Sequence, residues 1–135
     1  MNLLLAEDNL PDALLVREAI QMENLPLEVH IAPDGEQALE FFARAETDPE
    51  APSPHLLLVD LNLPKVDGLE VLRRIRASEK YKHIPAFIIT SSDSAADRDD
   101  GAKLGAGYFQ KPPNYQEFLK LGTFLKRFLE DNKLL

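Results

Sequence analysis

The chain contains no cysteine and no tryptophan, and acidic residues outnumber basic ones. Without cysteine, disulfides, thiolate nucleophiles and thiolate-ligated zinc sites are excluded. The 15 Lys and Arg residues against 23 Asp and Glu residues give a net charge of -8. Nonspecific binding to nucleic acids or to anionic membranes needs a basic surface. We therefore expect neither a nucleic-acid partner nor a membrane partner.

Long apolar runs are also absent, because no stretch approaches the roughly 20 residues that span a bilayer. The N-terminus enters an expected strand almost at once and leaves no room for a signal peptide. We therefore expect a cytoplasmic protein. At 135 residues the chain is long enough for one domain with a single core. We expect residues 1–135 to form that domain, with no separate output domain.

Short apolar runs alternate with helical stretches along the whole chain, a pattern typical of buried strands in a parallel sheet. We expect five strands, at about 2–6, 27–32, 56–60, 86–90 and 106–110. We expect helices at about 11–22, 36–45, 69–77 and 114–131. The segment 93–104 is expected to be the fifth helix, although a poor one, with four aspartates and an internal glycine. The segment 46–55, with three prolines and three acids, is expected to be an exposed loop.

This alternation predicts an α/β fold with right-handed crossovers and helices on both faces of the sheet. Five strands suit the flavodoxin-like, doubly wound order 2-1-3-4-5. In such a sheet the ligand crevice lies at the carboxyl ends of the strands, at the switch point between the first and third strands. The functional site is expected there.

Polar side chains follow four of the expected strands, namely Glu7 with Asp8, Asp60, Thr90 and Lys111. Three carboxylates held together repel one another by about 4 kcal/mol per pair at 4 Å and an effective dielectric of 20. A hard divalent cation removes this penalty, and Mg²⁺ suits a site of few carboxylates and several waters. We predict a site for Mg²⁺, or Mn²⁺, at this edge of the sheet.

Asp60 is the predicted nucleophile, because a carboxylate can attack phosphorus and form an aspartyl phosphate. Lys111 could neutralise charge on the transferring oxygens, and Thr90 could donate its hydroxyl to one of them. The backbone carbonyl of Asn62 could serve as a metal ligand. Taken singly, a strand threonine and a lysine after a strand are ordinary structural and surface residues. Their convergence with the three acids carries the prediction.

The chain resembles a receiver domain of two-component signalling, the CheY-like response-regulator family, over essentially its whole length. The resemblance is carried by the segments LLLAEDN at 3–9, LVDLNLP at 58–64, DGLEVL at 67–72, ITS at 89–91 and GAGYFQKP at 105–112. It implies a phosphoacceptor Asp60 that takes its phosphoryl group from a histidine kinase. It implies that Glu7 and Asp8 form the acidic pair of the metal site, with Asp8 a direct ligand.

The resemblance also implies a conformational switch and a place for the kinase. Thr90 matches the switch hydroxyl and Tyr108 the switch aromatic, although Tyr108 could instead be a buried structural residue. The family docks its kinase on the first helix, here near Pro11, Leu14 and Leu15. Such a domain is a signalling module that promotes its own phosphorylation and dephosphorylation, rather than an enzyme acting on a substrate.

The proline-rich 46–55 loop and the segment 61–65 are similar to those of stand-alone regulators paired with bacterial phytochromes. This similarity points to a bacteriophytochrome as the kinase. In the last expected helix, apolar residues cover an arc of roughly 220°, against about 100° for a one-sided surface helix. We hypothesise that Leu121, Phe124 and Phe128, with the fifth strand, form a homodimer face. The alternative is that neighbouring segments cover these side chains.

Three other functions compete with that of a phosphorylated receiver domain. A phosphatase of the haloacid-dehalogenase class needs a second Asp two residues after its nucleophile, where this chain has Asn62. A flavodoxin needs a Ser-, Thr- and Gly-rich phosphate loop after the first strand, where this chain has Glu7, Asp8 and Asn9. A receiver-like binding module that is never phosphorylated stays open, and metal binding would distinguish it.

Overall fold

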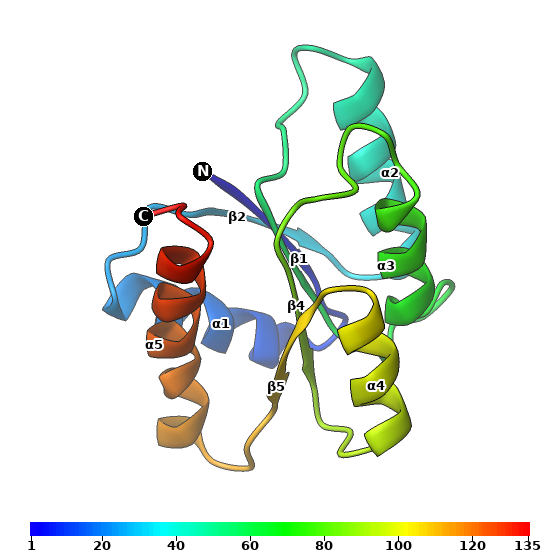
Figure 1. Ribbon diagram of the computed structural model, residues 1–135. Helices are drawn as coiled ribbons and strands as arrows, with labels where there is room; N and C mark the ends of the chain where they lie inside the picture. Colours follow the sequence, from blue (N-terminus) through cyan, green and yellow to red (C-terminus); the bar gives the residue numbers. More distant parts are fainter.

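The computed structural model describes residues 1–135 as a five-stranded parallel sheet covered by helices on both faces (Figure 1). The strand order β2-β1-β3-β4-β5 confirms the predicted doubly wound order. The elements are β1 Asn2–Ala6, α1 Leu10–Met22, β2 Glu28–Ala32, α2 Gly35–Thr47, β3 Leu56–Val59, α3 Gly68–Arg76, β4 Ala86–Thr90, α4 Ala95–Lys103, β5 Gly107–Gln110 and α5 Tyr115–Asp131.

The sheet separates two apolar layers, which explains why its strands are apolar on both faces. Leu3 and Leu5 of β1 point toward α1 and α5, whereas Leu4 and Ala6 point toward the layer of α2 and α3. Successive side chains of a strand point to opposite faces, so a strand between two helical layers buries every residue. All four residues of β3 and all five of β4 are buried.

Each helix begins at a polar cap just after a strand or loop, and the caps are Asn9, Asp34, Asp67, Ser94 and Asn114. In every case the side chain accepts a hydrogen bond from the backbone N–H three residues further on. Such caps satisfy donors that the first helical turn leaves open. Four of them follow the carboxyl ends of β1, β2, β4 and β5, so they also fix the adjacent loops.

The segment expected to be a poor helix does form α4, but with little core. Gly101 is its one buried residue, and a side chain there would meet the Ile88 side chain at 2.5 Å. Its C-terminal end is held by Arg76, whose guanidinium donates to the backbone carbonyls of Leu104, Lys82 and Ile84 at 2.7, 3.2 and 2.6 Å. The helix is therefore anchored at one end and lightly packed along its length.

The expected loop 46–55 begins two residues later than predicted, because α2 continues through Thr47. The remainder crosses to the amino-terminal edge of the sheet, where its carbonyl at Ser53 accepts from the Asn2 side chain at 3.1 Å. The Asn2 backbone N–H donates to the His55 ring at 2.9 Å. This loop therefore lies at the end of β1 opposite to Glu7.

The expectation that Leu121 lies on an exposed flank of the last helix is wrong, because Leu121 is 0% exposed. Its neighbour Gly122 explains the difference, since a side chain there would meet the Ala19 carbonyl of α1 at 2.4 Å. The two helices therefore approach closely at this point, and Leu121 turns into the core. Phe124 remains 46% exposed and Phe128 is half-buried. No helix in the structure is both long and apolar enough to cross a membrane.

Candidate functional site

Backbone hydrogen bonds bring the carboxyl ends of the central strands together. The Asp60 N–H donates to the Ala6 carbonyl at 2.9 Å, and the Lys111 N–H donates to the Thr90 carbonyl at 2.7 Å. The Glu7 N–H similarly reaches the last residue of β2 at 3.0 Å. The residues after β1, β3 and β5 thus meet at one edge of the sheet, as the sequence predicts.

Glu7, Asp8 and Asp60 offer carboxylate oxygens that all lie within 4.8 Å of one another. Glu7 and Asp60 are buried, whereas Asp8 is exposed. Hard oxygen donors with one open side match the preference of Mg²⁺ and Mn²⁺ for carboxylates and water. The three residues therefore fit a divalent cation that keeps part of its water shell.

Two donors orient the Asp60 carboxylate. The backbone N–H of Asn62 donates to Oδ1 at 3.0 Å, and the Lys111 ammonium donates to Oδ2 at 2.8 Å. The first contact closes a turn in which an aspartate accepts from the backbone two residues on. The Asn62 side chain is exposed, so its backbone is the part of this residue that adjoins the site.

Lys111 reaches into the cluster and is only 10% exposed. Its ammonium donates to three carboxylates, those of Glu7, Asp60 and Asp12, the last at 2.9 Å. Burial alone would lower the pKa of Lys111, but its hydrogen bonds to the three carboxylates outweigh that effect and raise it above its usual value. The ammonium is therefore a fixed positive charge beside Asp60.

The protein environment of Glu7 disfavours the anionic form of its carboxyl group. Burial raises the pKa of Glu7 to about 7, and the hydrogen bond from Lys111 opposes this rise while the nearby Asp60 adds to it. A nearby positive charge would stabilise the ionised form of Glu7, which burial and the neighbouring acid disfavour. This electrostatic state is a second reason why the site fits a cation.

Asp12 is a member of the site that the sequence reasoning missed. It lies in the first turn of α1, where its backbone N–H donates to the Asn9 side chain at 3.1 Å. Acidic residues in a first helical turn are common, because they interact favourably with the helix dipole. Only its placement one turn after Asp8 could have indicated a role, and that signal is weak.

The two predicted switch residues meet at the loop between β4 and α4. Thr90 is fully buried, and its Oγ1 accepts from the Ser92 N–H at 3.2 Å. The Tyr108 hydroxyl donates to the Ser92 carbonyl at 2.6 Å. Its ring is half-buried under Arg98, whose guanidinium lies 4.9 Å from the ring centroid. Tyr108 therefore contacts the start of α4 and is not a fully buried core residue.

The predicted kinase-docking residues flank this site on α1. Pro11 is exposed, Leu14 is 49% exposed and Leu15 is half-buried. Leu10, one residue earlier, is 61% exposed, and Tyr115 at the start of α5 is 51% exposed. An apolar surface thus borders the carboxylate cluster.

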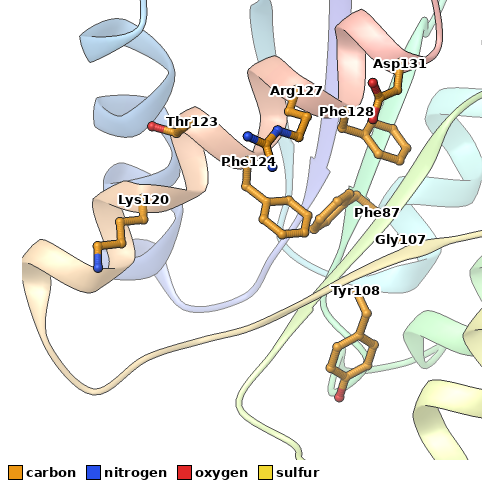
Figure 2. Close-up of a pocket in the computed structure, with 9 residues that line it drawn as sticks. All are labelled: Phe87, Gly107, Tyr108, Lys120, Thr123, Phe124, Arg127, Phe128 and Asp131. Atoms are coloured by element: carbon orange, nitrogen blue, oxygen red, sulfur yellow. The ribbon is translucent and has the colours of Figure 1, made fainter.

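A separate groove of about 630 Å³ runs between α5 and the edge strand β5. Figure 2 shows its aromatic floor, in which Phe124 and Phe128 from α5 lie against Phe87, while Tyr108 points away from them. The ring centroid of Phe87 lies 4.9 Å from that of Phe124 and 5.1 Å from that of Phe128. The lining consists of Phe87, Gly107, Tyr108, Lys120, Thr123, Phe124, Arg127, Phe128 and Asp131.

Comparison with known proteins places this constellation in a family. Residues 3–121 match the Response regulator receiver domain family. The chain belongs to this family. It is a receiver domain of two-component response regulators, as the resemblance implied, and hence a signalling domain.

Similar proteins include both short and long response regulators. The chain is 33% identical over 127 residues to Response regulator Rcp1 of Synechocystis sp., covering 93% of this chain and 86% of Rcp1. It is 36% identical over 129 residues to the transcriptional regulatory protein TrcR of Mycobacterium tuberculosis, covering 94% of this chain but 46% of TrcR. The receiver domain thus matches about half of TrcR and most of Rcp1.

Two solved structures share the fold and bear on the site. The structure of the phosphorylated cyanobacterial phytochrome response regulator RcpA has a TM-score of 0.85 and 31% identity, covering 94% of this chain and 91% of that one. The Mn²⁺-bound form of Rcp1 has a TM-score of 0.84 and 33% identity, covering 94% and 92%. The expected similarity to phytochrome-associated regulators is confirmed by RcpA. Divalent metal binding in Rcp1 agrees with the donor set of Glu7, Asp8 and Asp60.

Proposed function

We propose that this receiver domain accepts a phosphoryl group on Asp60 from the phosphohistidine of a sensor kinase. The observation that carries the proposal is the Asp60 carboxylate itself, buried between two neighbouring acids and a lysine that donates to it at 2.8 Å. A carboxylate held this way is oriented for attack and faces positive charge that can stabilise a transferring anion.

In the proposed step, an Asp60 oxygen forms a bond to phosphorus as the bond from phosphorus to the kinase imidazole breaks. The electron pair of that bond returns to the imidazole nitrogen, which takes up a proton from solvent. Lys111 donates to a phosphoryl oxygen, and Thr90 offers its hydroxyl to another. Glu7, Asp8, Asp60 and the Asn62 carbonyl would hold a divalent cation, which would neutralise part of the remaining charge. Hydrolysis reverses the attachment when water attacks phosphorus and the carboxylate leaves.

We propose that the signal travels through Thr90 and Tyr108. The Thr90 oxygen accepts from the Ser92 N–H at 3.2 Å, so its O–H is free to donate to a phosphoryl oxygen, and a shift of the hydroxyl toward that oxygen would act on Ser92. The Ser92 carbonyl also holds the Tyr108 hydroxyl. A change at Thr90 therefore alters the restraint on Tyr108 and on the start of α4, which is lightly packed.

The proposed kinase docks beside Pro11, Leu14 and Leu15 on α1, where apolar surface borders the acids. The similarity to the phytochrome response regulator RcpA supports a bacteriophytochrome as that kinase. With such a phosphodonor the protein would act in the cytoplasm.

Intact mass after incubation with acetyl phosphate and Mg²⁺ tests the proposed phosphoacceptor. We expect one added phosphoryl group on the wild type, dependent on Mg²⁺ and absent from Asp60→Asn. An adduct that persists in Asp60→Asn would assign the acceptor to another residue. If neither acetyl phosphate nor a cognate kinase produces an adduct, the receiver domain is a phosphorylation-independent binding module.

We also propose that the groove of α5 and β5 is a homodimer face. At 100° per residue, Lys120, Phe124, Arg127 and Asp131 lie within about 60° of one another around α5. In an antiparallel pairing of two α5 helices, Lys120 can oppose Asp131 of the second copy. Phe124 then opposes Arg127 of that copy, a cation over an aromatic ring. A parallel pairing would instead bring like charges together, so the charge pattern favours the antiparallel pairing, in which the same surface of both copies meets about a twofold axis.

Sedimentation at tens of micromolar protein tests this dimer. Lys120→Glu and Asp131→Lys are each expected to weaken it, and the double variant is expected to restore it by exchanging the two charges. Phe124→Glu should give a monomer, whereas Lys126→Glu, on the exposed side of α5 outside the groove, should not. A monomeric wild type, or a double variant no better than the singles, would rule out this pairing.

A further inference from the structure

Asp12 differs from the other two partners of Lys111 in that it contacts the lysine without belonging to the metal-binding group. The cluster of closely spaced carboxylates consists of Glu7, Asp8 and Asp60. The Asp12 side chain is 24% exposed, against 0% for Glu7 and 7% for Asp60, and its carboxylate lies 2.9 Å from the lysine ammonium. It is therefore the most solvent-accessible of the three anions that contact the lysine.

The hydrogen-bonding capacity of Lys111 makes this contact consequential. An ammonium has three N–H donors and no acceptor. In the structure those donors face Glu7, Asp12 and Asp60, so the group is saturated. A phosphoryl oxygen can receive a hydrogen bond from Lys111 only if one carboxylate gives up its own.

We propose that Asp12 is a positioning residue that restrains Lys111 in the resting site and competes with the phosphoryl group for its ammonium. This inference rests on the proposed phosphorylation of Asp60. Asp12 and a phosphoryl oxygen bonded to the same nitrogen would be two anions a few ångströms apart. Their repulsion in this partly buried site outweighs the modest side-chain order that Asp12 provides by restraining the lysine. Removing the charge should therefore favour the phosphoryl-bound state.

The helix does not depend on the Asp12 carboxylate for its start. The cap of α1 is made by the Asn9 side chain and the Asp12 backbone N–H, and both remain when the side chain changes. Asp12→Asn keeps the shape and removes the charge, whereas Asp12→Glu keeps the charge on a longer stem. The two variants separate an electrostatic role from a structural one.

The test is the affinity of the full chain for the beryllium trifluoride anion in the presence of Mg²⁺, followed by two-dimensional NMR. This anion binds a carboxylate noncovalently and mimics a phosphoryl group. We expect Asp12→Asn to bind it roughly tenfold more tightly than the wild type, the size of one charge-assisted hydrogen bond. Asp12→Glu should return toward the wild type. Asp93→Asn removes a charge from the exposed loop before α4 and should change little.

The metal-free proteins give an independent readout. The Lys111 side-chain signals should broaden or shift in Asp12→Asn, because one of three anchors is weakened, and should recover in Asp12→Glu. Unchanged or weaker binding of the mimic by Asp12→Asn would overturn the inference while leaving Asp60 as acceptor. A wild type that binds no mimic and takes no phosphoryl group would instead overturn the proposed function, and this inference with it.

Discussion

The Asp34 carboxylate caps α2, and its negative charge is expected to stabilise the folded protein. It accepts from the Gln37 backbone N–H at 2.7 Å and from the Gln37 side-chain amide at 3.2 Å, and Lys65 lies 3.7 Å away. The backbone hydrogen bond, aided by the Lys65 charge and the Gln37 amide, lowers the pKa of Asp34 below its ordinary value. The ionised form is therefore more stable in the folded protein than in the unfolded chain.

A pH dependence follows for Asp34→Asn. A lowered pKa contributes stability above the unfolded value, near 3.9, and that contribution is lost as the pH falls through the lower folded value. Because asparagine also caps helices well, only the charge is removed. We expect Asp34→Asn to unfold at lower denaturant than the wild type at pH 7, with the gap closing below about pH 4. Asp67 is a cap without a lysine partner, so Asp67→Asn should differ less from the wild type in its denaturant midpoint. A difference between Asp34→Asn and the wild type that is the same at every pH would contradict the charge argument.

At the residue scale, the sequence predicted the site residues whose position follows from the strand order. It missed the residue whose position depends on the conformation of its side chain. Glu7, Asp60 and Lys111 follow strand ends, and the topology of a parallel sheet brings strand ends together. Asp12 joins them because its side chain turns toward Lys111, a choice that no spacing rule predicts. Leu121 was misplaced for a related reason. Helical periodicity predicts the apolar arc of the last helix, but it does not predict which edge of that arc a neighbouring helix covers.

At the scale of elements, the contact between α1 and α5 is made possible by Gly122. A methyl group there would lie 2.4 Å from the Ala19 carbonyl oxygen and 3.0 Å from the Glu23 side chain. Backbone atoms cannot move aside as a flexible side chain can. The two helices must therefore separate locally if the position carries a side chain.

We expect Gly122→Ala to destabilise the receiver domain by about 1–2 kcal/mol. Overpacking costs roughly 1–3 kcal/mol, whereas alanine gains about 1 kcal/mol over glycine in a helix. The clash should win because the contact is with backbone. Urea unfolding measures the difference, with Lys126→Ala on the exposed side of α5 as the control. A Gly122→Ala variant as stable as the wild type would show that α1 and α5 separate at little cost.

The helices also show where sequence patterns reach their limit. The expected helices 11–22 and 114–131 begin within one residue of α1 and α5, because the first turn of a helix depends on local chemistry such as the caps Asn9 and Asn114. The segment 93–104 has too few apolar residues to predict a firm helix, yet it forms α4 with Ser94 as its cap. Its close approach through Gly101 to Ile88 depends on the sheet beneath it and is invisible in a local pattern.

At the scale of the whole molecule, the cation site links chemistry to stability. Folding brings the carboxylate of Asp60 beside those of Glu7 and Asp8, which lie far from it in the sequence, at the cost of their mutual repulsion. A cation that binds this folded arrangement and not the unfolded chain stabilises the protein by mass action. A measurement of unfolding can therefore detect cation binding at this site without any phosphodonor.

We expect Mg²⁺ or Mn²⁺ to raise the unfolding temperature of the wild type, with a gain of about 2.7 kcal/mol at a metal concentration of 100 times Kd. In Asp8→Asn the rise should be greatly reduced, because the exposed carboxylate of the group is lost. Differential scanning calorimetry with and without EDTA measures both. Asp93→Asn is the charge-matched control, and an equal response of Asp8→Asn would place the cation elsewhere.

The Arg76 anchor has a mechanical consequence for the whole molecule. Its guanidinium joins the end of α3, the loop before β4 and the Leu104 carbonyl at the end of α4. The opposite end of α4 rests on the Ser92 loop beside Thr90 and Tyr108. Because a helix that is held at one end moves most at the other, we expect α4 to pivot about the end that Arg76 holds. A small displacement beside the buried hydroxyl of Thr90 would then produce a larger displacement of the whole helix at the protein surface.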